Sequence, residues 1–347
     1  MIIQFPNSPI FMHKETTTVI RKERDSNFEL CRLACMLYIV IYHLIIHVPQ
    51  VYESTLWGRP LRTLCHIGVV VFVMISGYFG IKRKWKRLLS LALSVSFYNA
   101  LGITIAILFF HQQFEVKSLF SVIFPVFQGG YWFITSYAVL YLIAPYINMV
   151  LEKLDKREFI ILLVVFAAVV WYGGGIWGNA IGHGRGIMAF VLSYSIGYYI
   201  HKFYSCKGQS FTYWGGQYLL VSAMIFACVA FLPGIMAKGV NYLCFGYNEI
   251  GLYVMSVLFL LMFQGVKIKS KIINWGATSC LGIYLCHGNT NISSLIVYPH
   301  YSHFLLGNID NQWLLLLAHI IFALIVVMCC VIIDKIRQCI FSFVERK

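Results

Sequence analysis

Charged residues are scarce in this sequence. Only 12% of its 347 residues are Asp, Glu, Lys or Arg, whereas 60% are hydrophobic and the mean hydropathy is +0.76. Soluble domains carry about 25% charged residues. The composition therefore excludes an ordinary soluble fold and points to a chain that lies largely within a membrane.

Several metal and redox motifs are also missing. The chain has eleven cysteines, but none form a C-x-x-C pair and most lie within apolar runs, which argues against a disulfide framework or a zinc site. His43 and His47 have the i,i+4 spacing of a zinc helix, yet Leu44 stands where H-E-x-x-H requires glutamate. We therefore expect no metal.

Linkers, fixed-period repeats and low-complexity tracts are absent as well. A polar stretch with seven charged residues precedes the first apolar run, and no small-residue cleavage site follows that run. We expect this first span to be an uncleaved anchor. The predicted organisation is a cytoplasmic tail over residues 1–27, one membrane domain over residues 28–340 and a short cytoplasmic tail over residues 341–347.

Apolar runs long enough to cross a ~30 Å hydrocarbon core recur along the chain. They predict an all-α membrane bundle of about ten helices. The expected spans are residues 30–48, 65–81, 88–110, 131–149, 159–172, 186–201, 217–233, 249–266, 277–298 and 312–336.

The basic residues indicate the topology. With a cytoplasmic N-terminus, 21 of the 27 lysines and arginines lie in the inside segments and five in the outside segments. This asymmetry follows the positive-inside rule and places both termini in the cytoplasm. The net charge of +14 comes from short clusters between apolar runs, so we expect membrane lipids and no nucleic acid as partners.

The first span carries three ionisable residues in or beside an apolar helix: Glu29, Arg32 and His43. Arg32 and His43 share a helix face and stand roughly 16 Å apart along the axis. Glu29 and Arg32 could form an interfacial i,i+3 pair, and His43 an interhelical hydrogen bond. Alternatively, His43 is a general base or a nucleophile that carries an acyl group.

The second span runs directly into five cations within residues 82–87. Topology and lipid headgroups explain such a cluster in part. The other reading is a docking site for a polyanionic donor such as coenzyme A, because guanidinium and ammonium groups bind phosphates. Under that reading Arg83, Lys84 and Arg87 bind the donor.

Aromatic residues and a further histidine complete the candidates. Tyr131 and Trp132 open the fourth span, where an aromatic belt is the ordinary explanation. His287 lies in the ninth span, as a polar helix contact or as a wall of an active site. The outside connection 173–185 is rich in glycine and aromatic residues, which suit the apolar faces of sugars.

Taken together, these stretches resemble the acyltransferase 3 family of integral-membrane acyltransferases. The matching residues are 28–33 leading to His43, 68–77, 131–133 leading to 141–145, and 282–287. They occur in the family's order within residues 27–340.

The resemblance implies transfer of an acyl group, usually acetyl, from cytoplasmic acetyl-CoA or another acyl-CoA. The acceptor would be a hydroxyl of an extracytoplasmic or lipid-linked saccharide, and the site would be the bacterial cytoplasmic membrane. Arg32 and His43 would be the family's first-span arginine and essential histidine, with Glu29 in place of the more usual aspartate. We expect Tyr131, Trp132 and His287 on the acceptor side.

The sequence departs from the family at the donor motif. Where the family commonly has Arg-x-x-Arg, this chain has Lys84 to Arg87, with Arg83 one residue earlier. No SGNH-type hydrolase domain is attached, so transfer must finish within the bundle or on a separate partner. A secondary transporter or flippase of a lipid-linked glycan is the alternative, although the paired broken helices or repeats of many such folds are not evident.

Overall fold

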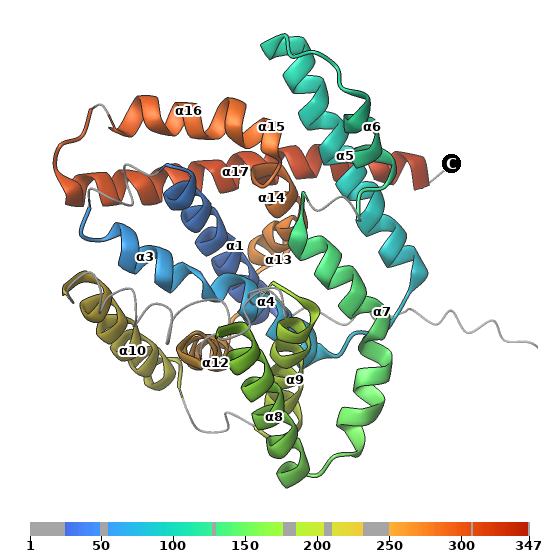
Figure 1. The fold of residues 1–347 in the computed structure, drawn as a ribbon, viewed down its shortest axis with the longest axis vertical. Coiled ribbons are helices and arrows are strands. Elements are labelled where there is room, and N and C mark those ends of the chain that lie inside the picture. Colours follow the sequence, from blue (N-terminus) through green and yellow to red (C-terminus); the bar gives the residue numbers. More distant parts are fainter. Residues whose placement is uncertain are drawn as a thin grey trace, which may run out of the picture.

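The computed structural model describes residues 25–48, 55–126, 130–175, 185–204, 210–231, 250–306 and 308–345. All regular elements among these residues are helices (Figure 1), which confirms the predicted all-α bundle. Large apolar side chains are exposed along the outer helices, for example Leu108, Val164, Leu219 and Ile325. Such a surface is stable only when lipid covers it, and the protein is an integral membrane protein.

Six stretches of the described chain are long and apolar enough to cross a membrane. They comprise α1 (Ser26–His47), α3 (Gly58–Cys65) with α4 (Ile67–Phe79), α5 (Trp85–Phe110), α7 (Trp132–Lys153), α10 (Phe211–Phe231) and most of α17 (Gln312–Glu345). Three more expected spans are α8 (Lys156–Gly175), α9 (Ile187–Phe203) and the shorter apolar α12 (Ile250–Gln264).

The ninth expected span, 277–298, is not one continuous helix. It consists of α13 (Lys271–Ala277), α14 (Cys280–His287), α15 (Thr290–Ile292), α16 (Tyr298–Tyr301) and two π-helical turns (Ser293–Val297 and Ser302–Leu306). The helix stops at Gly288 because the Asn289 side chain accepts hydrogen bonds from the backbone N–H groups of Asn291 and Ile292 and starts a new helix. From there α15 and α16 turn to run beside α17 (Figure 1).

The connection after α5 also differs from the simple outside loop expected over residues 111–130. Helix α6 (Val116–Ile123) folds back along α5 (Figure 1). The Ser96 hydroxyl donates to the Val122 carbonyl at 2.7 Å, and the Asn99 amide donates to the Ser121 carbonyl at 2.6 Å. Because Ser96 and Asn99 stand near the middle of α5, α6 returns along the side of α5 instead of remaining at its end.

Glycines let two helices cross at very short range. A Cβ at Gly77 of α4 would lie 1.9 Å from the Tyr194 carbonyl oxygen, and one at Gly197 of α9 would lie 1.9 Å from the Met74 carbonyl oxygen. Small residues allow this approach in membrane helices. The crossing fixes α9 against the end of α4, where the basic cluster begins.

A buried ion pair ties α17 to α5. Arg337 donates to Asp334 at 2.8 Å and to the Ser94 hydroxyl at 3.0 Å, and the Tyr98 hydroxyl donates to Asp334 at 3.0 Å. Gly282 of α14 packs against Asp334, so close that a Cβ there would overlap the carboxylate. This network therefore holds α14, and with it His287, in a fixed position.

Candidate active site

Two histidines from distant parts of the sequence meet inside the bundle. His43 lies on α1 and His287 on the last turn of α14. The Nδ1 atom of His43 is 3.1 Å from the Nε2 atom of His287, and the ring centroids are 5.1 Å apart. The structure thus brings together two residues that the sequence predicted separately, one as catalytic and one on the acceptor side.

The hydrogen bonds of this pair determine where the protons are. The Nδ1 atom of His287 is 2.5 Å from the carbonyl oxygen of Ile283. A carbonyl only accepts, so His287 carries its proton on Nδ1 and, when neutral, presents a lone pair on Nε2. His43 must then donate from Nδ1. Its Nε2 atom is left with a lone pair, as a general base requires.

The histidine pair borders a cavity of about 550 Å³, which we call the histidine cavity. Apolar side chains of α1 and α4 form part of its wall, and hydroxyl-bearing residues after Gly288 form another part. His47, one turn beyond His43, stacks on Tyr298 with ring centroids 4.7 Å apart. Of the described residues that line the cavity, Arg185 alone has a permanent charge.

Tyr131 and Trp132 both line the histidine cavity. The Tyr131 hydroxyl donates to the Leu285 carbonyl at 2.8 Å and accepts from the Asn289 amide at 3.1 Å. The guanidinium carbon of Arg185 lies 5.6 Å from the centroid of the Trp132 ring, within range of a cation–π contact. These two residues therefore contribute to the site and not only to an interfacial belt.

Arg32 and Glu29 do not reach the histidine pair. They form an i,i+3 ion pair of 2.7 Å near the start of α1, and the guanidinium of Arg32 lies 5.8 Å from the centroid of the Phe79 ring. Roughly 16 Å of helix separates Arg32 from His43. They therefore lie at the opposite end of α1 from the histidine pair.

The basic cluster sits on a turn with a rigid backbone. Gly80 has φ +66°, a conformation that favours glycine, and ends α4. The Ile81 N–H donates to the Tyr194 hydroxyl at 2.8 Å, and the Asn148 amide donates to the Ile81 carbonyl at 3.0 Å. The Lys84 N–H donates to the Tyr141 hydroxyl at 2.9 Å.

The side chains of this cluster face outward. Arg83, Lys84 and Arg87 are all exposed. The guanidinium of Arg83 lies 5.6 Å from the ring centroids of both Trp85 and Tyr146. Arg87, with Tyr137 and Tyr141, lines a second cavity of about 250 Å³, which we call the donor-side pocket.

Three aromatic rings in contact, those of Tyr137, Phe133 and Tyr284, connect the walls of the two cavities, and we call them the aromatic septum. Tyr137 lines the donor-side pocket, and Tyr284 lines the histidine cavity. The Phe133 ring contacts both, with ring centroids 5.6 Å from Tyr137 and 5.4 Å from Tyr284. The Tyr137 hydroxyl is 3.1 Å from the Ser76 hydroxyl. Two family-like stretches thus supply the septum, and a third contacts it through Ser76.

Two features considered in the sequence analysis, a metal site and residues 176–184, add nothing to the site described above. The described residues contain no group of three or more His, Cys, Asp or Glu side chains that could hold a metal ion. Residues 176–184 of the glycine- and aromatic-rich connection lie outside the described residues.

Sequence reasoning assigned no role in the site to Arg185, Asn289 or Tyr298. A signal existed for one of them: Asn289 begins a polar run, N-T-N-I-S-S, inside an otherwise apolar span, and such a run indicates a break.

The fold and the histidine pair define an integral-membrane helix bundle with two hydrogen-bonded imidazoles beside an internal cavity. A family model described as an acyltransferase domain, that of the acyltransferase 3 family, matches residues 25–334. The chain belongs to this family and is a membrane acyltransferase. No curated protein and no solved structure matches it.

Proposed function

We propose that this protein transfers an acetyl group from cytoplasmic acetyl-CoA to a hydroxyl of an extracytoplasmic or lipid-linked polysaccharide in the bacterial cytoplasmic membrane. The observation that carries this proposal is the hydrogen-bonded series from Ile283 through His287 to His43. It leaves the Nε2 lone pair of His43 available beside a cavity large enough for an acceptor.

On the donor side, the phosphates of coenzyme A bind Arg83, Lys84 and Arg87, which are exposed on the turn after α4 and the first residues of α5. Charge-assisted hydrogen bonds to phosphate are about twice as strong as neutral ones. The pantetheine arm then enters the donor-side pocket beside Arg87 and passes the aromatic septum. Arg32 with Glu29 stands near this end of the bundle and helps to hold the donor.

At the histidine cavity, the Nε2 atom of His43 removes the proton of the acceptor hydroxyl as its oxygen attacks the thioester carbonyl carbon. The new carbon–oxygen ester bond forms, the carbon–sulfur bond breaks, and the thiolate of coenzyme A takes the proton back from His43. During the step, His287 accepts a hydrogen bond from Nδ1 and stabilises the transient imidazolium. Tyr131 and Trp132 border the acceptor.

A covalent route uses the same atoms. His43 first attacks the thioester carbonyl carbon with Nε2, and the carbon–sulfur bond breaks to release the thiolate of coenzyme A. The acceptor hydroxyl then attacks the acyl-imidazole, the carbon–nitrogen bond breaks, and the departing imidazole takes the hydroxyl proton and passes it to the thiolate. Rapid quenching distinguishes the two routes, because only the covalent route leaves labelled acetyl on the protein before acceptor is added.

The test is transfer of radiolabelled acetyl from acetyl-CoA to glycan in membranes that contain the wild-type protein or the His43→Ala variant at matched abundance. His300→Ala is the control, because His300 is exposed and lines neither cavity. We expect His43→Ala to lose at least ~10²-fold of the transfer, the usual contribution of a general base. Equal labelling by His43→Ala and wild type would overturn the mechanism.

Transport of a lipid-linked glycan is the second candidate, and one observation favours it. The break at Gly288 gives a discontinuous helix, which transporters often have at their binding sites. Movement of glycan across the membrane without consumption of acetyl-CoA would support transport.

A further inference from the structure

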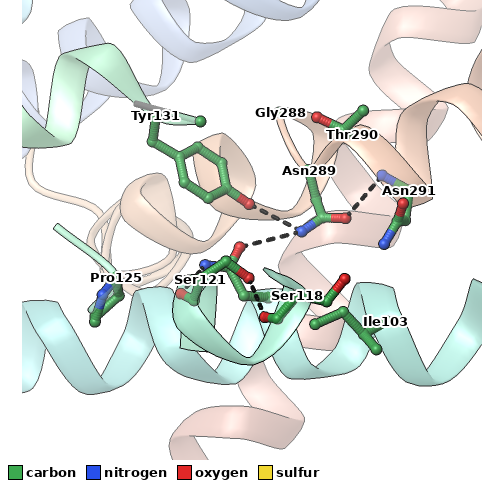
Figure 2. A pocket seen from close by; sticks show the side chains of 11 residues that line it. Ile103, Ser118, Ser121, Pro125, Tyr131, Gly288, Asn289, Thr290 and Asn291 are labelled. Carbon is green, nitrogen blue, oxygen red and sulfur yellow. Dashed lines mark hydrogen bonds between the residues drawn. The ribbon is translucent and has the colours of Figure 1, made fainter. Parts of the chain in front are cut away.

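A third cavity adjoins the histidine cavity. This polar chamber has a volume of about 180 Å³ and is lined by α5, by α6 and by the chain after α14 (Figure 2). Gly130, Tyr131, Gly288 and Thr290 line both cavities. The two spaces are therefore neighbouring compartments with Tyr131 at their boundary.

The lining of the polar chamber is polar but uncharged. Of the eleven residues that line it, none is Asp, Glu, Lys, Arg or His. Besides Tyr131, the side chains with an amide or a hydroxyl are Asn99, Ser118, Ser121, Asn289, Thr290 and Asn291. Polar groups inside a membrane bundle are costly and usually mark a function. This lining suits a neutral ligand that offers many hydrogen bonds.

Some of these polar groups already have structural partners. The Asn289 amide holds the Tyr131 hydroxyl and the Tyr98 carbonyl, and its oxygen caps α15. The Ser121 hydroxyl donates to the Ser118 carbonyl (Figure 2). These bonds fix the wall of the chamber.

Other groups remain available for a ligand. Within the part of the chain that the structure describes, no hydrogen bond involves the side chains of Ser118, Thr290 or Asn291, although all three line the chamber. Their hydroxyl and amide groups offer both donors and acceptors.

The chemistry excludes the donor from this chamber. The phosphates of coenzyme A need cations, and the lining has none. An acyl chain would leave the amide and hydroxyl groups unpaired, which costs about 1–3 kcal/mol for each buried group. A sugar ring, by contrast, presents hydroxyls to these groups and an apolar face to Tyr131.

We propose that the polar chamber binds a neutral sugar unit of the acceptor, adjacent to the unit whose hydroxyl is acylated at His43. This inference rests on the proposed function and extends it, because the acceptor must then have at least two linked units. Asn291 and Ser118 bind the second unit, and the chain of sugars passes Gly130 and Tyr131.

Gly130 provides a direct way to close that passage. A Cβ at this position would meet no protein atom within 4 Å, and Gly130 lines both compartments. The Gly130→Val substitution therefore places a branched side chain at the shared opening, where its Cβ meets open space. Asn291→Ala tests the chamber independently, because it removes an amide group from the lining.

The experiment measures two quantities in the same membranes: transfer of labelled acetyl to the host glycan, and binding of labelled acetyl-CoA. Gln113→Ala is the control, because Gln113 is an exposed polar residue in the connection before α6 and lines neither compartment. We expect transfer to fall about tenfold in Gly130→Val and in Asn291→Ala, as for a lost hydrogen bond of ~1.4 kcal/mol. Acetyl-CoA binding should stay at the wild-type level, which also shows that the variants fold.

Small probes test the class of ligand. Methyl glycosides of glucose and N-acetylglucosamine are the neutral probes, and methyl glucuronide and inorganic phosphate are the charged ones. We expect the neutral probes to inhibit transfer by wild type and to inhibit Asn291→Ala more weakly.

Acetyl transfer at the wild-type level in both Gly130→Val and Asn291→Ala would overturn the inference while leaving the proposed function intact. Inhibition by the charged probes alone would overturn the neutral class. Absence of His43-dependent transfer by the wild-type protein would overturn the proposed function, and this inference with it.

Discussion

The basic turn after α4 and the histidine pair hold their functional groups by different means. On the turn, the hydroxyls of Tyr141 and Tyr194 accept from the backbone and the Asn148 amide donates to it, while the cationic side chains stay exposed. In the histidine pair, the functional atoms themselves are hydrogen-bonded, and the pair lies inside the bundle.

Under the proposed function, this difference indicates what each region requires. A polyanion is attracted by positive charge at a range of several ångströms, so the turn needs cations in roughly the right place. Proton transfer needs an acceptor atom within about 3 Å. The departure from Arg-x-x-Arg at Lys84 is therefore a modest change, whereas a change at His287 that removes its acceptor atom alters the proton position on His43.

The largest effect is expected from removing the hydrogen-bond acceptor that His287 offers to His43. In His287→Phe the ring remains, but His43 loses the acceptor that fixes its Nδ1–H tautomer. We expect the kcat for acetyl transfer to fall by about 10²-fold, with acetyl-CoA binding unchanged.

His287→Gln serves as the matched variant, because its side-chain oxygen can accept from His43 and restore part of the rate. Equal activity of the Phe and Gln variants would show that His287 has a packing role only.

A smaller effect is expected from removing one exposed cation. Arg83→Ala or Arg87→Ala should raise the KM for acetyl-CoA about tenfold, the value of one charge-assisted hydrogen bond, with little change in kcat. The lysine variants should retain most of the affinity. Kinetics in nanodiscs at two salt concentrations would measure both effects, since salt screens exposed charges.

Arg157→Ala is the control for these variants, because Arg157 is an exposed arginine at the start of α8. A fall in kcat at constant KM would instead place Arg83 or Arg87 close to the reacting atoms.

The septum can be tested separately from either region. Phe133→Ala removes the ring between Tyr137 and Tyr284, and water then reaches the thioester more readily. We expect a severalfold increase in coenzyme A released per acetyl transferred. A thiol assay measures the released coenzyme A, and the radiolabel assay run in parallel measures the acetyl groups transferred.

Phe120→Ala is the control for the septum, because Phe120 is an exposed residue of α6. An unchanged ratio in Phe133→Ala would mean that water is excluded by another part of the site.

The smallest effect is expected at the scaffold of the basic turn. Tyr141→Phe keeps the ring in the donor-side pocket but loses the hydroxyl that accepts from the Lys84 N–H and donates to the carbonyls of the turn. We expect a twofold to threefold rise in the KM for acetyl-CoA and a loss of about 1 kcal/mol in stability. Tyr213→Phe, at an exposed position of α10, should change neither.

Much of the fold could be predicted from the sequence because a helix needs about 20 apolar residues to cross the hydrocarbon core of a membrane. His43 was predictable because an imidazole is conspicuous in an apolar helix. The Glu29–Arg32 pair was predictable because helix geometry alone brings residues i and i+3 together.

The rest depended on contacts that no local pattern encodes. The hydrogen bond between His43 and His287 joins α1 to α14, and only the packed bundle brings them together. The break at Gly288 was missed because the apolar residues on either side outweigh the short polar run. The return of α6 was missed because an eight-residue helix is too short to predict as a membrane element.

The aromatic septum also bears on the membrane as an electrical insulator. Under the proposed function the donor enters from one face of the membrane and the acceptor from the other, so the protein resembles a channel with two mouths. Ring contacts from Tyr137 through Phe133 to Tyr284 place a series of apolar rings between residues that line the two cavities. We expect protons and ions to meet these rings as a barrier, so that acyl transfer proceeds without loss of the transmembrane potential.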